Sequence, residues 1–458
     1  MNLERQEKKR VVVGTGQTGE SCMRFFSRSD LAFSVFDTRD NPQGVSHLLQ
    51  EFSNIDFRFG ADKVSVLKEA DQLVLSPGVD LSDAIFRTVD VSSKELTNDI
   101  AIFSDIAVAP KVLITGSNAK STVTTLVGKM AESAGLRVAV GGNLGKPALD
   151  LLDDETEAYI LELSSFQLEY CSNLGAKVAA ILNISNDHLD RHHSMDNYQR
   201  IKQRIYQGAE SIIFNRHDPL TRPVHSSSLT SLKSFGIDSP KAGHYGVVEV
   251  DGKQFISRGS DLLLAVEEIP LQGEHNLMNI VAAIAIGDMA NIPVNAMVSA
   301  IKGFNGLPHR CERVAVIAGV TYYNDSKATN EGATVSAVRS MSKITNGAVV
   351  VILGGRAKQD DFSSLFGQLQ GVRYKVILIG ESAELIKSFV PEDITVVFAD
   401  SLTSAVEQAK AISIAEDIVL LSPACASFDM FDNFEQRGDI FKQSVLNLTS
   451  GIDDKESH

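Results

Sequence analysis

The segment from Lys111 to Thr122 constrains this chain more than any other. It reads KVLITGSNAKST: an apolar run that predicts a buried strand, then a short polar loop, then a lysine and two hydroxyl residues where a helix would begin. Backbone N–H groups of such a loop and of the first helical turn point at phosphate groups. Lys120 would add a positive charge, and the hydroxyl of Ser121 or Thr122 could reach a magnesium ion. The segment therefore predicts a site for a nucleotide triphosphate.

Two features of this loop depart from the general phosphate-loop pattern. It is shorter than G-x-x-x-x-G-K-[ST], and Ala119 stands before the lysine, where glycine is usual. If the backbone there needs a positive φ, the β-carbon of Ala119 costs roughly 1–2 kcal/mol. On the motif alone, an ordinary strand-to-helix turn without a ligand remains an alternative, so the rest of the chain has to decide.

Length and charge narrow the class of protein. A chain of 458 residues is too long for one core, and roughly 150 residues per domain predicts about three domains. The formal charge of −15 argues against a nucleic-acid or anionic-membrane partner, which would need a basic face. No segment approaches the roughly 20 apolar residues of a membrane span. The four cysteines are scattered without C-x-x-C spacing, which indicates reduced, mostly buried thiols in a cytoplasmic protein.

The first unit, residues 1–98, is expected to be Rossmann-like. Strands are predicted at residues 10–16, 32–37 and 72–78, with a helix at 20–27. Short strands that alternate with helices indicate a parallel sheet with helices on its faces.

A dinucleotide-binding fingerprint lies in this unit. Gly14, Gly16 and Gly19 follow the first strand with G-x-G-x-x-G spacing, and Asp37 ends the second strand. The fingerprint indicates a phosphate next to a helix N-terminus and a ribose near an acid, but it does not identify a nicotinamide. NAD and any other nucleotide diphosphate with a ribose would use the same geometry.

The second unit, residues 99–306, begins with the phosphate loop and predicts a central, P-loop ATPase-like parallel sheet. Strands at 158–166 and 178–185 have the continuous apolar runs of buried parallel strands. Glu162 lies inside the first of these, where a carboxylate is costly unless a cation or hydrogen bonds compensate it. An acid on a strand beside a phosphate loop is where a magnesium-holding residue belongs. The alternative is a carboxylate that caps a nearby helix.

The third unit, residues 307–458, is expected to be a second Rossmann-like sheet. Its strands are predicted at residues 347–355, 374–380, 394–400 and 417–423, separated by helical stretches such as 404–411. Glycines or small polar residues stand at the carboxyl ends of these strands, where open α/β sheets bind ligands.

Two further residues are candidates for the site only in combination with the phosphate loop. His188 lies in a polar loop that leaves the strand ending near Ser185, and Lys202 lies in a predicted helix over 197–206. Alone, such a histidine is more often structural, and such a lysine is nearly always a solvent-facing charge.

Eight motifs occur in the order seen in the Mur ligases of peptidoglycan synthesis, and the chain resembles that family over nearly its whole length. They are TGSNAKST (115–122), GGNLG (141–145), LELSSF (161–166), NDH (186–188), GEHNLMN (273–279), GLPHR (306–310), NDSKATN (324–330) and LSPACAS (421–427).

The resemblance implies an ATP-dependent amide ligase. Among its members the pattern is most similar to the one that adds D-glutamate to UDP-N-acetylmuramoyl-L-alanine in the cytoplasm. The γ-phosphoryl group of ATP would convert a carboxylate into an acyl phosphate, which the amine of D-glutamate would attack. Implied cofactors are ATP, two magnesium ions and a carbamate on Lys202. We expect a monomer that takes only these small-molecule substrates, without nucleic acid and without membrane insertion.

The resemblance also assigns roles to residues. The implied catalytic and metal-holding residues are Lys120, Ser121, Glu162, His188 and Lys202. Those for ATP are Gly116, Ser117, Asn118, Ala119, Lys120, Ser121, Thr122, Asn279, Arg310, Asp325 and Lys327. Those for UDP are Gln17, Thr18, Asp37, Thr38, Arg39 and Gly78. Those for the muramoyl peptide are Asn143, Ser164 and His188, and those for D-glutamate are Thr329, Lys358, Ser427 and Phe434.

Three other functions stay open at this point. An NAD-dependent oxidoreductase would explain Gly14 to Gly19 and Asp37 but leaves Lys120, Glu162 and His188 without a role. A nucleotide-binding regulatory protein without catalysis has only Ala119 in its favour. A sister ligase that adds another amino acid, or one that extends folate with glutamate, is nearer, although the segment 422–427 favours D-glutamate.

Overall fold

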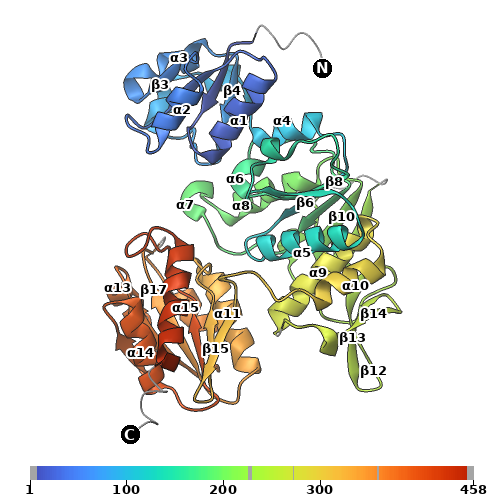
Figure 1. The fold of residues 1–458 in the computed structure, drawn as a ribbon, viewed down its shortest axis with the longest axis vertical. Coiled ribbons are helices and arrows are strands. Elements are labelled where there is room, and N and C mark those ends of the chain that lie inside the picture. Colours follow the sequence, from blue (N-terminus) through green and yellow to red (C-terminus); the bar gives the residue numbers. More distant parts are fainter. Residues whose placement is uncertain (1–7, 225–229, 272, 358–359, 451–458) are drawn as a thin grey trace. The chain divides into compact units, whose positions relative to one another are not determined.

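Three sheets with helices on their faces make up the computed structural model of this protein, which describes residues 8–224, 230–271, 273–357 and 360–450 (Figure 1). The expected three-domain α/β fold class is confirmed. By packing, the chain divides into two compact units. The first contains residues 1–184, 188–266 and 280–302, and the second contains 185–187, 267–279 and 303–458. The boundaries at 98 and 306 stay a prediction.

The N-terminal sheet is fully parallel, with strand order β3-β2-β1-β4-β5. Its elements are β1 (Arg10–Val13), α1 (Gln17–Arg28), β2 (Ser34–Asp37), α2 (Val45–Glu51), β3 (Phe57–Phe59), α3 (Ser65–Glu69), β4 (Gln72–Leu75) and β5 (Glu95–Thr97). The chain leaves β1 in one direction and returns to β4 on its other side, so the strand order reverses between these two strands. Ligands of open α/β sheets bind at the carboxyl ends of strands at such a point.

The central sheet has nine strands in the order β14-β13-β12-β11-β10-β9-β6-β8-β7. Its strands are β6 (Lys111–Thr115), β7 (Val138–Gly142), β8 (Ala158–Glu162), β9 (Val178–Ile181), β10 (Ser211–Asn215), β11 (Ser231–Phe235), β12 (Tyr245–Val250), β13 (Lys253–Arg258) and β14 (Asp261–Ala265). The strands from β7 to β12 pair in parallel. Strands β13 and β14 add an antiparallel extension that the sequence patterns did not predict.

Helices cover the central sheet and connect its strands. They are α4 (Asp99–Ile106), α5 (Lys120–Ser133), α6 (Ser165–Leu168), α7 (Leu189–His192), α8 (Met195–Lys202), α9 (Glu274–Met289) and α10 (Val294–Lys302), with the short 3₁₀ turns η5 (Ala148–Leu151) and η6 (Gln203–Tyr206). Helix α5 packs on β6, β7 and β8, and α10 packs on α5 (Figure 1). Because strand β6 lies between β8 and β9, the loop that follows it is flanked by both of their carboxyl ends.

The C-terminal sheet has the order β15-β16-β20-β17-β18-β19 and is parallel except for β15. Its elements are β15 (Glu312–Ile317), β16 (Val320–Asn324), α11 (Glu331–Lys343), β17 (Val349–Gly354), α12 (Ser363–Gln368), β18 (Tyr374–Ile379), α13 (Ala383–Lys387), β19 (Val396–Phe398), α14 (Leu402–Ile412), β20 (Ile418–Leu421) and α15 (Phe434–Ser450). The hairpin of β15 and β16 was not predicted, whereas the four predicted strands all form.

Two element boundaries differ from the predicted runs, and in each case a serine side chain caps the start of a helix. The run 158–166 gives a strand only to Glu162, since Ser164 caps α6 through a reciprocal pair of hydrogen bonds with Gln167. Likewise the predicted helix 197–206 begins at Met195, because Ser194 caps it, and it changes to 3₁₀ geometry after Lys202.

Two expectations about the whole chain can be compared with the fold. Among the described residues, no helix is long and apolar enough to cross a membrane. Cys22, Cys171 and Cys425 are buried, Cys311 is partly exposed, and all four are free thiols, as predicted.

Candidate active site

The phosphate loop joins β6 to α5 and has a strained backbone at Ala119. Its φ is 65° and its ψ is 0°, so the left-handed conformation that motivates glycine at this position is present with a β-carbon. Asn183, after β9, holds the loop in place. Its Oδ1 accepts a hydrogen bond from the Asn118 N–H at 2.8 Å, its Nδ2 donates to the Asn118 carbonyl at 3.2 Å, and its carbonyl accepts from the Ser117 N–H at 2.9 Å. The neighbouring strand therefore fixes the loop's conformation.

Two lysines converge on this loop. Lys120 donates to the Gly116 carbonyl at 2.9 Å, and Lys202 donates to the same carbonyl at 2.9 Å and to the Thr115 hydroxyl at 3.3 Å. Lys202 is 1% exposed and also lies over the ring of Tyr198, at 4.8 Å from its centroid. Lys202 is thus buried at the loop. It is not the solvent-facing charge that a lysine in a polar helix usually is.

Glu162 ends β8 directly beside the loop, because it pairs in register with Ile114 of β6. It is 3% exposed, and its Oε1 accepts a hydrogen bond from Asn143 Nδ2 at 2.8 Å. Its Oε2 is buried and has no hydrogen-bond partner among the described residues. Gly142 lets the ends of β7 and β8 lie this close together, since a β-carbon on Gly142 would be 2.5 Å from the Glu162 carbonyl oxygen.

A buried carboxylate oxygen without a partner is costly unless a cation or a proton compensates it. At Glu162 the orphan oxygen lies on the strand next to the phosphate loop, and Ser121, 3% exposed, lies in the first turn of α5. In the described part of the chain, no three His, Cys, Asp or Glu side chains cluster as a self-sufficient metal site. The buried Glu162 oxygen beside a hydroxyl residue of the phosphate loop fits magnesium, which takes oxygen ligands and usually keeps waters and substrate phosphates in its coordination shell.

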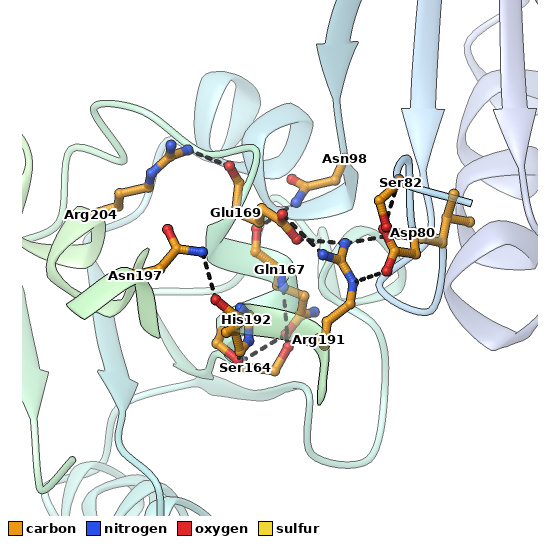
Figure 2. Close-up of polar contacts among 12 residues, drawn as sticks. Asp80, Ser82, Asn98, Ser164, Gln167, Glu169, Arg191, His192, Asn197 and Arg204 are labelled. Atoms are coloured by element: carbon orange, nitrogen blue, oxygen red, sulfur yellow. Dashed lines mark hydrogen bonds and ion pairs between the residues drawn. The ribbon is translucent and has the colours of Figure 1, made fainter. Parts of the chain in front are cut away.

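The loop that contains His188 follows β9 and leads into α7. His188 adopts a left-handed conformation, with φ of 54°, and caps α7, while its ring contacts Phe166 at a centroid distance of 4.9 Å. His192, which is fully buried, pairs with the Ser165 hydroxyl at 2.9 Å, and its carbonyl accepts from Asn197 of α8 at 3.0 Å (Figure 2). Helices α6, α7 and α8 are therefore joined around His188, and the first unit contains all four expected catalytic residues.

The Rossmann loop of the N-terminal sheet has the close contacts that its glycines predict. Gly14 has a φ of 102°, and a β-carbon on Gly19 would lie 1.9 Å from the Gly14 carbonyl oxygen. Gln17 and Thr18 open α1 after this turn, and the side-chain amide of Gln17 donates to the Gly145 carbonyl of the central domain at 3.4 Å. Gly78 lies in the loop after β4, on the other side of the strand-order reversal.

Asp37 ends β2 and is 2% exposed. Its carboxylate accepts from the Thr15 N–H at 2.9 Å, the Thr15 hydroxyl at 2.7 Å and the Arg39 guanidinium at 2.8 Å through each oxygen. Burial raises the pKa of Asp37, but the hydrogen bonds from Arg39 and Thr15 outweigh it and lower this pKa to about 2. The acid therefore organises the loop, and its contact with uridine stays a prediction, as do those of Thr38 and Arg39.

The remaining expected nucleotide residues, Asn279, Arg310, Asp325 and Lys327, belong to the second unit. Asp325 follows β16, is 8% exposed, and accepts from the Ser422 hydroxyl at 2.9 Å and the Cys311 N–H at 3.1 Å. Burial raises the pKa of Asp325 to about 6, against these hydrogen bonds.

The second unit brings most of the expected D-glutamate residues into one region. The ammonium of Lys327 lies 4.3 Å from the ring centroid of Phe434, at the start of α15. The Ala328 carbonyl, next to Thr329, accepts from the Ala424 N–H at 2.9 Å, which joins this segment to the one that ends at Ser427. Lys358 lies outside the described residues.

Sequence reasoning missed several residues that support these sites. Arg437 is fully buried in α15 and donates to the Ser326 hydroxyl, the Ser326 carbonyl and the Cys425 carbonyl at 2.9, 2.7 and 3.2 Å. Burial lowers its pKa to about 10. Nothing in a polar helical segment distinguishes this arginine from a surface charge, whereas Asn183, an amide at the end of a buried strand, could have been found.

Family models match three consecutive parts of the chain. They are described as the Mur ligase MurD-like N-terminal domain at residues 8–97, the Mur ligase middle domain at 114–287 and the Mur ligase glutamate ligase domain at 309–425.

Similar proteins cover the chain almost completely. A relative from Pseudomonas fluorescens, described as UDP-N-acetylmuramoylalanine–D-glutamate ligase, is 44% identical over 98% of this chain and 100% of its own length. One from Legionella pneumophila with the same description is 43% identical over 96% of this chain and 99% of its own length. The crystal structure of MurF from Acinetobacter baumannii matches with a TM-score of 0.60 and 15% identity, over 97% of this chain and 93% of that one, which supports the fold alone.

Proposed function

We propose that this chain, which belongs to the Mur ligase family, is the ATP-dependent ligase that adds D-glutamate to UDP-N-acetylmuramoyl-L-alanine in peptidoglycan precursor synthesis. The observation in the structure that carries the proposal is the buried Oε2 of Glu162, which has no hydrogen-bond partner in the described part of the chain and lies on the strand beside a phosphate loop that holds Lys120. A buried carboxylate oxygen at that position would be satisfied by a metal cation, which would in turn bind the polyphosphate. The assignment to D-glutamate is supported by full-length similarity to relatives of that description.

The chemistry requires activation of a carboxylate, which is a poor electrophile because its charge is delocalised and oxide is a poor leaving group. Lys120 and the loop N–H groups would hold the triphosphate so that its γ-phosphoryl group faces the carboxylate of the L-alanine residue. Asn143, Ser164 and His188 would orient the muramoyl peptide. The resulting acyl phosphate loses inorganic phosphate when the amine of D-glutamate attacks the carbonyl carbon.

Magnesium, when bound, would offset the charge repulsion between ATP and the carboxylate. Ser121 and Glu162 would hold one ion, and His188 with Lys202 a second. For Lys202 to serve a hard cation, its ammonium has to become a carbamate, which turns a positive donor into oxygen ligands. The burial of its Nζ at the Gly116 carbonyl supports this modification.

The second unit would supply the incoming amino acid and further nucleotide contacts. Thr329, Ser427 and Phe434, together with Lys358, would bind D-glutamate, and Asn279, Arg310, Asp325 and Lys327 would face ATP. The support is that Lys327 lies over Phe434 and that the segment of Thr329 pairs with the segment of Ser427.

The N-terminal domain would hold the UDP group between the loops that follow β1 and β4. There UDP is remote from the reacting carboxylate, so its binding energy would serve to orient the substrate. We also propose a cytoplasmic location and a monomer, in keeping with ligands that are all small molecules.

One assay tests the proposal. Purified protein is incubated with ATP, magnesium and UDP-N-acetylmuramoyl-L-alanine, and with D-glutamate, L-glutamate or another amino acid in separate reactions, and the products are read by mass spectrometry. We expect a dipeptide product and one phosphate per product with D-glutamate only. A product with L-glutamate, or with a different amino acid alone, would assign the chain to a sister ligase.

A further inference from the structure

Arg191 links two parts of the first unit that are far apart in sequence. It lies in α7, three residues after His188, and Figure 2 shows its guanidinium between Glu169 and Asp80. Its Nη1 and Nη2 donate to the Glu169 carboxylate at 3.3 and 2.8 Å. On the other side, Nη2 donates to the Val79 carbonyl at 3.2 Å, and Nε lies 3.4 Å from the Asp80 carboxylate. One planar side chain therefore holds both the central domain and the N-terminal domain.

This cluster is largely removed from water. The side chains of Arg191, Asp80 and Glu169 are 16%, 24% and 20% exposed. Burial lowers the pKa of Arg191, but Glu169 and Asp80 outweigh it and raise this pKa above its usual value. The Asp80 carboxylate in turn accepts from the Ser82 N–H at 2.8 Å, which fixes its loop. A bridge at this burial is screened less than a surface ion pair.

The N-terminal end of the bridge is the loop after β4. Val79 and Asp80 directly follow Gly78, and Ser76 of the same loop lies against Gly14, where a β-carbon would be 2.8 Å from the Ser76 hydroxyl oxygen. Arg191 therefore holds the loop that faces the Rossmann glycines, at the strand-order reversal, which is where open α/β sheets bind ligands.

The central end of the bridge is the set of helices around His188. Glu169 is the C-cap of α6, whose N-cap is Ser164, and the Glu169 carbonyl accepts from Arg204, in the turn that follows Lys202. Arg191 itself is on α7, whose N-cap is His188. The loop after β4 is thereby connected to α6 and α7, which follow the proposed site residues Ser164 and His188, and to the turn after Lys202 at the end of α8.

We propose that Arg191 is a positioning residue that couples occupation of the UDP loop to the arrangement of the helices carrying His188 and Lys202. The inference rests on the proposed function and deepens it. The UDP group then does more than raise affinity: through Arg191 it increases the rate of ligation at a distant carboxylate.

A second bridge between the same two domains provides a matched control. Arg24 of α1 donates to the Asp150 carboxylate in η5 at 2.6 Å through Nη2 and at 3.3 Å through Nε. The Arg24 and Asp150 side chains are 30% and 17% exposed. Arg24 lies on α1 and Asp150 in η5, so this bridge joins the two domains without including the loop after β4 or helices α6 to α8.

The test compares two acceptors in wild type and variants. The first is UDP-N-acetylmuramoyl-L-alanine, and the second is the same muramoyl-L-alanine with the UDP group replaced by a free reducing end. In the wild type we expect a higher kcat with the first acceptor. In Arg191→Gln we expect kcat with the first acceptor to fall about tenfold while kcat with the second changes less than about twofold, because the truncated acceptor never uses the bridge. Arg24→Gln should keep the wild-type ratio.

The second acceptor also reports that the variant is folded. Arg191→Lys keeps the charge, but an ammonium lacks the planar set of donors that contacts Glu169 and Asp80 together. The ratio of kcat with the first acceptor to kcat with the second should therefore be intermediate. Equal losses with both acceptors, or an unchanged ratio in Arg191→Gln, would overturn the coupling, as would a wild type with equal kcat for both acceptors. If the wild type makes no product with D-glutamate from either acceptor, the proposed function itself fails.

Discussion

Two loops in this protein follow a β-strand and open a helix, yet they are built differently. The loop after β1 uses glycines: Gly14 has a positive φ, and Gly19 lies where any β-carbon would collide with the Gly14 carbonyl oxygen. The loop after β6 has Ala119 at a positive φ, held by Asn183, and lysines at its carbonyl groups.

Their acids differ as well. Asp37, beside the first loop, accepts hydrogen bonds on both carboxylate oxygens from Arg39 and Thr15. Glu162, beside the second loop, keeps one buried oxygen without a hydrogen-bond partner among the described residues. The first loop is therefore complete in itself and suited to hold a remote group. The second loop lies beside a buried carboxylate oxygen that a bound cation would satisfy. A site for a polyphosphate and its metal ion needs such a group.

Removing the loop lysine should have the largest effect. Lys120→Ala should lower kcat/KM about a thousandfold, because in the proposed reaction its charge would face the triphosphate during phosphoryl transfer. The fold should survive, and Lys129→Ala, an exposed position on the same helix, should keep wild-type turnover. Steady-state kinetics and thermal melting check both. Near-normal turnover in a folded Lys120→Ala would show that the loop after β6 is not the ATP site.

Lys202→Ala should lower activity about a hundredfold, because a carbamate that serves the metal would be lost. Formate or acetate should restore part of this activity by occupying the vacated position, whereas Lys120→Ala should not respond to either. Arg200→Ala, exposed on the same helix, is the control. Full activity of Lys202→Ala, or an intact-mass spectrum in bicarbonate together with a crystal structure that shows a bare amine, would contradict the carbamate.

The hydrogen-bonded carboxylate of Asp37 predicts that the free energy of unfolding depends on pH. The pKa of Asp37 is lowered to about 2 in the fold, so its stabilisation is present above the unfolded pKa near 4 and is lost as pH falls toward 2. Asp37→Asn should therefore lower the free energy of unfolding by about 2 kcal/mol between pH 5 and 8, and by less below pH 4.

Denaturant unfolding of wild type and Asp37→Asn across this range measures the effect. The exposed Asp56, which pairs with Arg58, offers a control in Asp56→Asn that should change stability little. A difference that grows as the pH falls would have the wrong sign for this account.

The smallest effect is expected at Ala119. Since its φ is 65°, Ala119→Gly should raise stability by about 1 kcal/mol and keep or slightly improve ATP affinity. Ala134→Gly, at a φ of −83° after the same helix, should not stabilise the protein. A hundredfold loss of activity in Ala119→Gly would mean that the methyl group is part of the site's packing.

Much of this architecture could be predicted from local patterns. Apolar runs bounded by glycine predicted the strands that precede Gly14 and Gly116. Glu162 could be singled out because a carboxylate inside a buried apolar run is costly unless a cation or hydrogen bonds compensate it. The eight ordered motifs carried the family resemblance. The sequence analysis missed strands that are short or that mix polar with apolar residues, because these give a weaker signal than a continuous apolar run. They are β3, β5, β7, β10 to β14, β15 and β16.

Side-chain partners could not be predicted in the same way. Whether Asp37 faces a ribose or Arg39, whether Lys202 is exposed or buried, and whether Arg191 bridges two domains all depend on contacts between residues distant in sequence. Arg437 is the clearest case, since its burial comes from the packing of α15 on the segments of Ser326 and Cys425.

The central claim is that the loop after β6 holds the ATP whose phosphoryl group is transferred to the substrate carboxylate, while the UDP end is bound elsewhere, at the loop after β1. The most direct measurement uses UDP-N-acetylmuramoyl-L-alanine whose alanine carboxylate carries heavy oxygen, with ATP, magnesium and D-glutamate, and follows the label by mass spectrometry. An acyl phosphate predicts that one heavy oxygen appears in each inorganic phosphate and that ADP stays unlabelled. Unlabelled phosphate beside a fully formed amide product, or label in AMP, would contradict it.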